Sequence, residues 1–94
     1  MNERYSWLWD VEMDAQTFER CLQGEQALGR FDPDWALLRL LEYAPYREIR
    51  RLLPVRRFIR RWPELAPRMR SAARRGGTDF LRTWLMNEGD VDHE

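Results

Sequence analysis

The chain has 94 residues, 44% of them hydrophobic and including five Trp, four Phe and three Tyr, enough for one small domain. Its single cysteine excludes an intrachain disulfide and a zinc site built from several cysteines. The formal net charge is zero, but residues 1–46 hold four Arg against nine acids, residues 47–75 eleven against two, and residues 76–94 one against five.

The N-terminus lacks the basic region and apolar run of a signal peptide. No segment approaches the roughly 20 apolar residues of a membrane span. We therefore expect a cytoplasmic protein without membrane contact. It should form a single domain over residues 1–94, with residues 1–6 and 88–94 frayed.

No run of alternating β-branched residues indicates a strand, and helical periodicity recurs along the chain. Asp14 is a predicted N-cap for a helix over about residues 15–23. In that helix Phe18, Cys21 and Leu22 share one face. Cys21 is therefore expected to be a small core residue and not a nucleophile.

The next helix has the clearest start in the sequence. Asp32 is a predicted N-cap, and Pro33 stands at the first helical position, where a proline is tolerated. The helix should run over residues 33–43. Its broad apolar surface predicts the central, most buried helix, with Arg39 and Glu42 exposed.

Two short helices are predicted on either side of Pro54. In each helix the hydrophobic residues share one face and the arginines take the opposite one. Both sets of arginines should lie on the solvent side, where packing does not need them. They form the predicted partner-binding face: Arg47, Arg50, Arg51, Arg56, Arg57, Arg60 and Arg61.

Two prolines after residue 62 bracket a turn or short helix. Residues 68–75 are expected to form another short helix that runs into a flexible joint at Gly76–Gly77. Thr78 is the predicted N-cap of a last helix through about Asn87. Its predicted buried stripe is Phe80, Leu81, Trp84 and Leu85. The pattern as a whole predicts an all-α protein, a compact bundle of about four to six short helices without a sheet.

Few residues in the chain could support catalysis. His93, the only histidine, lies next to the C-terminus and has no scaffold to orient it. Asp10, Glu12 and Asp14 alternate and could hold Mg²⁺ in an extended segment. However, Asp14 is expected to act as a cap, and the other two as surface or salt-bridge groups. We therefore predict no catalytic residue, metal site or cofactor, and no enzyme activity.

The arginine face leaves three interpretations open. It can be a solvated surface without further meaning. It can bind the phosphates of a nucleic acid, although it lacks the Asn, Gln, Ser or Thr side chains that distinguish bases. It can also bind an acidic protein partner, because arginine binds carboxylates with two parallel hydrogen bonds. A fourth possibility is self-assembly through exposed tryptophans, and the oligomeric state stays open.

Three segments carry a resemblance to a known group of proteins: Leu8–Asp14, Leu38–Tyr43 and Arg47–Leu53. The chain resembles small bacterial helical proteins with a Leu-Trp-Asp start and an Arg-x-Leu-Glu-Tyr helix, mainly over residues 7–53. Such proteins look like the partners encoded beside nucleotidyltransferase toxins of the abortive-infection type. The resemblance implies an antitoxin-like role in which the chain binds and restrains the toxin. It implies no catalytic residue.

Overall fold

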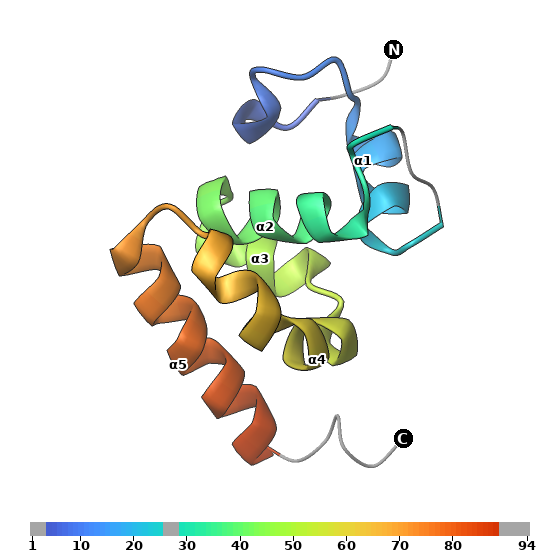
Figure 1. Cartoon of the computed structure of the whole chain (residues 1–94). Coiled ribbons are helices and arrows are strands. Elements are labelled where there is room, and N and C mark those ends of the chain that lie inside the picture. Colours follow the sequence, from blue (N-terminus) through green and yellow to red (C-terminus); the bar gives the residue numbers. More distant parts are fainter. Residues whose placement is uncertain (1–3, 26–28, 89–94) are drawn as a thin grey trace.

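The computed structural model describes residues 4–25 and 29–88 of the chain. Five α-helices and two short 3-10 helices lie within these ranges, and no strand does. In chain order they are η1 (Ser6–Leu8), α1 (Ala15–Leu22), α2 (Pro33–Tyr43), α3 (Tyr46–Leu52), α4 (Val55–Leu65), η2 (Ala66–Arg68) and α5 (Ala72–Glu88) (Figure 1). The prediction of an all-α bundle of four to six helices without a sheet is confirmed, although α5 is longer than expected.

Aspartate caps start α1 and α2 as predicted. The Asp14 carboxylate accepts a hydrogen bond from the backbone N–H of Thr17 at 2.8 Å. The Asp32 carboxylate accepts one from the backbone N–H of Trp35, also at 2.8 Å. Pro33 occupies the first turn of α2, where its missing N–H breaks no helical bond. Each cap satisfies an N–H group that the helix itself leaves without a partner.

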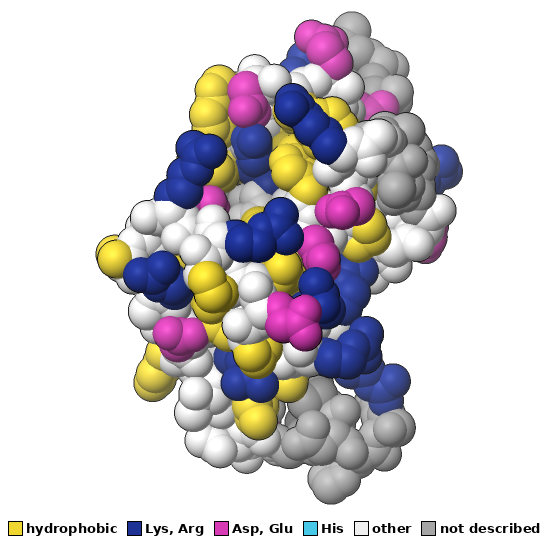
Figure 2. All heavy atoms as spheres, in the orientation of Figure 1, with side chains coloured by type: hydrophobic (Ala, Val, Ile, Leu, Met, Phe, Trp, Pro, Cys, Tyr) yellow, Lys and Arg dark blue, Asp and Glu magenta, His cyan; other side chains and the backbone are white. Residues whose placement is uncertain are grey.

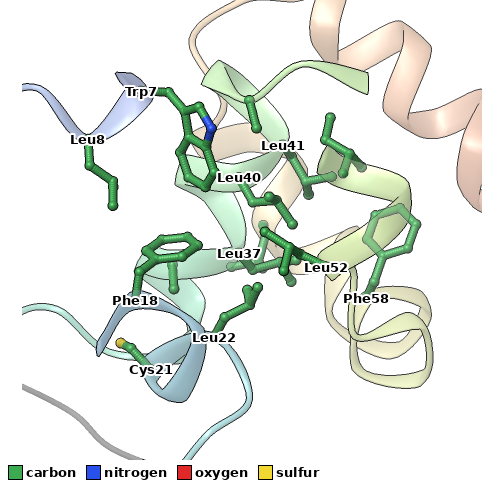
Figure 3. Packing of buried hydrophobic residues seen from close by; sticks show 14 of the residues in the cluster. Trp7, Leu8, Phe18, Cys21, Leu22, Leu37, Leu40, Leu41, Leu52 and Phe58 are labelled. Atoms are coloured by element: carbon green, nitrogen blue, oxygen red, sulfur yellow. The ribbon is translucent and has the colours of Figure 1, made fainter. Parts of the chain in front are cut away.

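Helix α2 lies at the centre of the molecule and packs against α1, α3, α4 and α5 (Figure 1). Its most buried residues are at most 1% exposed: Ala36, Leu37, Leu40 and Leu41. Figure 3 shows Leu37 between Phe18 of α1 and Phe58 of α4. Burial of such a side chain contributes roughly 1.5–3 kcal/mol, so these contacts hold the bundle together. The prediction that this helix is the central one is confirmed.

Helix α5 runs through Gly76–Gly77 without the predicted joint. Ser71 directly precedes its first residue, and the Ser71 Oγ accepts a hydrogen bond from the backbone N–H of Arg74 at 3.1 Å. Thr78, the predicted N-cap, lies inside the helix and donates from Oγ1 to the Arg74 carbonyl at 2.7 Å. Thr78 and Leu81 are both buried. The cap at Ser71 and this buried side of the helix explain why two glycines do not interrupt it.

Helix α4 also continues where a turn was predicted, because it passes through Pro63. A proline has no N–H to donate to the carbonyl four residues earlier, which here is that of Ile59. The Nε of Arg82 in α5 donates to this carbonyl at 2.9 Å. A side chain from a neighbouring helix thus replaces the bond that Pro63 cannot make.

The N-terminal segment packs on the helices. The Tyr5 ring stacks on Trp7 with centroids 4.7 Å apart. The Tyr5 hydroxyl donates a hydrogen bond to the Glu19 carboxylate in α1. Tyr5, one of the residues for which fraying was predicted, therefore packs on the helices. Residues 1–3 and 89–94, also predicted to fray, lie outside the described ranges.

Candidate protein-binding surfaces

The arginines of the predicted binding face point in different directions, and Arg61 turns back onto α2. Its Nη2 and Nε donate to the two carboxylate oxygens of Asp34 at 2.8 and 3.3 Å. Its Nη1 donates to Glu64 at 2.7 Å. The hydrogen-bonded Asp34 carboxylate raises the pKa of the Arg61 guanidinium. Arg61 therefore links α4 to the first turn of α2.

Arg57 is half-buried and forms a hydrogen bond to the C-terminal end of α1. Its Nη2 donates to the carbonyl of Leu22, the last residue of α1, and to the Pro33 carbonyl at 3.4 Å. Carbonyls at a helix C-terminus carry partial negative charge, which favours a guanidinium there. Burial lowers the pKa of Arg57. The prediction that Arg57 and Arg61 project into solvent is wrong, because the helical pattern does not reveal acceptors on neighbouring helices.

The arginines of α3 diverge as well. Arg51 donates to the Tyr5 hydroxyl at 3.0 Å and so faces the N-terminal segment. Arg50 faces α5, where its Cζ lies 5.0 Å from the ring centroid of Trp84. Its Nη1 donates to the Tyr46 hydroxyl at 3.2 Å. A guanidinium over an indole ring makes a favourable cation–π contact. The predicted single solvent face is therefore not formed.

Five of the seven predicted arginines nevertheless have exposed side chains. Arg51 is one of them, but it forms a salt bridge with Glu48 at 2.5 Å. Glu48 is the only acidic residue between positions 46 and 62. We call the other four the exposed arginines: Arg47, Arg50, Arg56 and Arg60. The outer sides of α3 and α4 therefore carry a surplus of positive charge.

A groove of about 460 Å³ is lined by residues of α2, α3 and α5. Its lining consists of Leu41, Tyr46, Ile49, Ala73, Arg74, Gly77, Thr78 and Leu81. The Nη1 of Arg74 already donates to the carbonyls of Leu41 and Ala44, at 2.9 Å each. The Thr78 hydroxyl is bonded within α5. Because these polar groups are engaged, the groove suits an apolar side chain better than a polar small molecule.

Two rings that were predicted to be buried on α5 lie at the surface. Phe80 is 72% exposed and Trp84 is 39% exposed. The core-facing side of α5 is taken by Thr78, Leu81 and Leu85. The apolar residues of α5 cover more of the helix surface than the core contacts. The sequence pattern therefore does not reveal which of them are buried. Figure 2 shows exposed hydrophobic side chains interspersed with basic ones on the face that includes α5.

Arg39 was predicted to be exposed, but only 11% of its side chain is exposed, and it contacts several other residues. It donates to both carboxylate oxygens of Asp10 at 2.7 and 3.1 Å, and this hydrogen-bonded guanidinium lowers the pKa of Asp10. Its Cζ also lies 4.9 to 5.4 Å from the ring centroids of Trp9, Trp35 and Tyr43. These contacts fasten the N-terminal segment to α2, and no periodicity in the sequence indicates them.

The alternating carboxylates Asp10, Glu12 and Asp14 do not converge on a metal site. Asp14 caps α1, and Asp10 pairs with an arginine of α2. Among residues 4–25 and 29–88, no three His, Cys, Asp or Glu side chains lie close enough to hold a metal. Cys21 is buried and donates from Sγ to the Phe31 carbonyl at 3.0 Å. Burial raises the pKa of its thiol, which disfavours the nucleophilic thiolate.

Comparisons of the chain with protein-family models, curated proteins and solved structures found no match. No helix in the part of the chain that the structure describes is long and apolar enough to cross a bilayer. His93 lies outside the described residues. The candidate sites are therefore two surfaces: the exposed arginines of α3 and α4, and the apolar side of α5 beside the groove.

Proposed function

We propose that this chain is a non-catalytic binding protein that holds an acidic surface of a second protein against its exposed arginines. The resemblance over residues 7–53 supplies the kind of partner. It is a nucleotidyltransferase toxin, which the chain binds and restrains as an antitoxin. A protein with this role needs no catalytic group, metal or cofactor of its own.

The observation that carries the proposal is the positive surplus on α3 and α4. Arg47 and Arg60 form no salt bridge among the described residues. Both side chains are exposed, Arg47 on α3 and Arg60 on α4. A partner carboxylate could form a salt bridge with either of them. The planar guanidinium would bind it through two parallel hydrogen bonds, which a lysine ammonium cannot do.

The surroundings of Arg50 favour a protein over a nucleic acid as the partner. Arg50 lies beside two exposed rings, those of Tyr46 and Trp84. Arg, Tyr and Trp are the residues that most often dominate the binding energy of protein interfaces. Residues 46–62 also contain no Asn, Gln, Ser or Thr to read base edges. Nucleic-acid phosphate is the competing ligand, and salt dependence separates the two.

The test is co-expression of the chain with a nucleotidyltransferase of the abortive-infection type, for which the proposal predicts a gene beside that of this chain. The two proteins should co-purify, and the chain should restore growth when the toxin is expressed. Arg47→Ala with Arg60→Ala should weaken the complex strongly, because removal of one member of a desolvated charge pair costs about 2–5 kcal/mol. The matched control is Arg20→Ala with Arg68→Ala, two exposed arginines outside α3 and α4 that should be dispensable.

Two results would contradict the proposal. One is a complex that survives neutralisation of all four exposed arginines, which would make them a solvated surface. The other is turnover by the purified chain alone. It should show no nucleotidyltransferase, nuclease or hydrolase activity. Activity that disappears on Asp10→Asn would instead place a catalytic site in the acidic segment.

A further inference from the structure

Helix α5 has a second apolar side, all of whose residues are exposed at the surface, although Arg50 of α3 lies over one of its rings, that of Trp84. Helical periodicity places five residues on it, at spacings of three and four: Ala73, Gly76, Gly77, Phe80 and Trp84. None of them is charged. Phe80 is the most exposed large hydrophobic residue in the described part of the chain, at 72%. This side borders the groove, because Ala73 and Gly77 also line it.

The fold does not explain the two glycines of this side. Neither Gly76 nor Gly77 has a positive φ, so an alanine would fit the backbone of α5. A Cβ atom added at either position would meet nothing within 4 Å. Glycine inside a helix lowers its stability relative to alanine. What the glycines provide is open space on the outside of α5, where another chain can approach closely.

The apolar side of α5 has small residues in one half and large aromatic residues in the other. Ala73, Gly76 and Gly77 form the flat N-terminal half, and the rings of Phe80 and Trp84 form the raised C-terminal half. Two copies of α5 that lie antiparallel bring the rings of each copy onto the flat half of the other. The ring of Phe80 in one copy then meets the groove beside Gly77 of the other copy. This groove suits an apolar ring, because the Arg74 and Thr78 groups that line it already form hydrogen bonds within their own chain.

The charges at the ends of α5 favour the same pairing. Arg70 and Arg75 stand at the N-terminal end, and the first turn holds no acidic residue. Glu88 stands at the C-terminal end, whose last turn holds no basic residue. Both ends therefore carry charge of the sign that their own helix dipole disfavours. An antiparallel second copy places Glu88 of one chain near the arginines of the other, and it also aligns the two dipoles favourably.

We propose that two copies of this chain form a symmetric dimer through antiparallel packing of their α5 helices. The interface is isologous, so each copy contributes the same rings and the same flat half. The proposal does not rest on the toxin partner, although the two surfaces meet where Arg50 lies over Trp84. The substitutions that test it, at Phe80 and Gly77, leave the exposed arginines of α3 and α4 unchanged.

The test measures the mass of the full-length chain by sedimentation equilibrium over a wide concentration range. The wild-type chain should be a dimer that dissociates on dilution. Phe80→Glu should be monomeric at concentrations where the wild type is dimeric, because it places a carboxylate against the apolar groove. Gly77→Leu should have the same effect by filling the space that the partner ring needs. Circular dichroism should show that both variants keep the helical fold.

Met86→Glu is the matched control. Met86 is also an exposed apolar residue of α5, at 41%, but periodicity places it well away from the side that carries Phe80. This variant should remain a dimer. A wild-type chain that is monomeric at every concentration would overturn the proposal. A dimer that persists in Phe80→Glu would overturn it as well, since the copies would then meet through another surface.

Whether the two α5 helices pack antiparallel or parallel can be measured by energy transfer between attached dyes. In a Cys21→Ala background, one dye is attached at Ala72→Cys in one copy and a second at Glu88→Cys in the other. Energy transfer between these positions should be high in an antiparallel pair. The helix is about 25 Å long, from 17 residues at a rise of about 1.5 Å each, so the dye pair must have a transfer range shorter than this. With such a pair, transfer between two copies that are both labelled at Glu88→Cys should be lower. The reverse order would mean that the helices pack in parallel, and the antiparallel dimer would be rejected.

Discussion

Arg82 of α5 donates from its Nε to the carbonyl oxygen of Ile59 in α4 at 2.9 Å. This oxygen would bond to the N–H of residue 63 in a regular helix, but that residue is Pro63. The arginine thus compensates for a proline in another helix. A lone unsatisfied carbonyl in a packed helix is costly, so the contact explains how α4 continues past the proline.

The first prediction concerns this replacement. Arg82→Met should lower the free energy of unfolding by about 1–3 kcal/mol, the loss expected when a buried acceptor is left without a donor. Pro63→Ala restores an N–H to the Ile59 carbonyl, so Arg82→Met should cost much less in that background. Urea unfolding of the four proteins in the cycle measures the difference. Equal losses in both backgrounds would show that Arg82 acts in some other way.

The second prediction separates two arginines of α4. Arg57→Met should destabilise the protein by about 1–3 kcal/mol, because the Leu22 and Pro33 carbonyls lose their donor. Arg60→Met, an exposed position on the same helix, should change the stability by less than about 0.5 kcal/mol. Thermal unfolding followed by circular dichroism compares the two. A larger loss for Arg60→Met would contradict the assignment of Arg57 to the interior.

The third prediction concerns acid stability. Arg39 lowers the pKa of Asp10 in the folded state, so the unfolded chain takes up the Asp10 proton more readily. The pair therefore contributes fully above the unfolded pKa of about 3.9, and the contribution disappears as the pH falls through the lower folded value. Asp10→Asn should be less stable than wild type at pH 7, and the difference should vanish near pH 2. Glu12→Gln, an exposed neighbour, is the control and should show no such trend.

The sequence predicts those parts of the fold that depend on local signals. Asp14 and Asp32 cap helices because a short carboxylate side chain reaches the N–H groups of the next turn. The burial of α2 follows from the breadth of its apolar surface. Both features need only residues within one turn of each other, so no knowledge of the rest of the molecule is required.

The misplaced features depend on contacts between distant residues. Gly76–Gly77 suggests a joint only if the cap at Ser71 and the packing of Leu81 on the core are unknown. The arginines were assigned to solvent by periodicity alone, yet Arg57 reaches a carbonyl 35 residues away in the sequence. An arginine has five N–H donors on a long side chain, and its acceptor can lie on any neighbouring helix. Sequence periodicity therefore separates buried from exposed positions for leucines better than it does for arginines.

The last prediction concerns the exposed arginines and decides between the classes of partner. The variant carries Arg47→Gln, Arg50→Gln, Arg56→Gln and Arg60→Gln together. If these side chains bind phosphates, the logarithm of the affinity for duplex DNA falls linearly with the logarithm of the salt concentration. Each lost contact should then reduce the slope by about 0.9, so the variant should lose roughly three to four units.

If the exposed arginines bind carboxylates of the nucleotidyltransferase, salt should slow association of the complex, and the loss of affinity should depend on which arginine is changed. The two ligands are measured on the same protein preparations, with Arg20→Gln and Arg68→Gln, at two exposed positions outside α3 and α4, as the control. A steep salt slope for DNA that the four substitutions abolish would assign the surface to nucleic acid. Loss of toxin binding by the same variant, with weak and salt-insensitive contact to DNA, would support the protein partner.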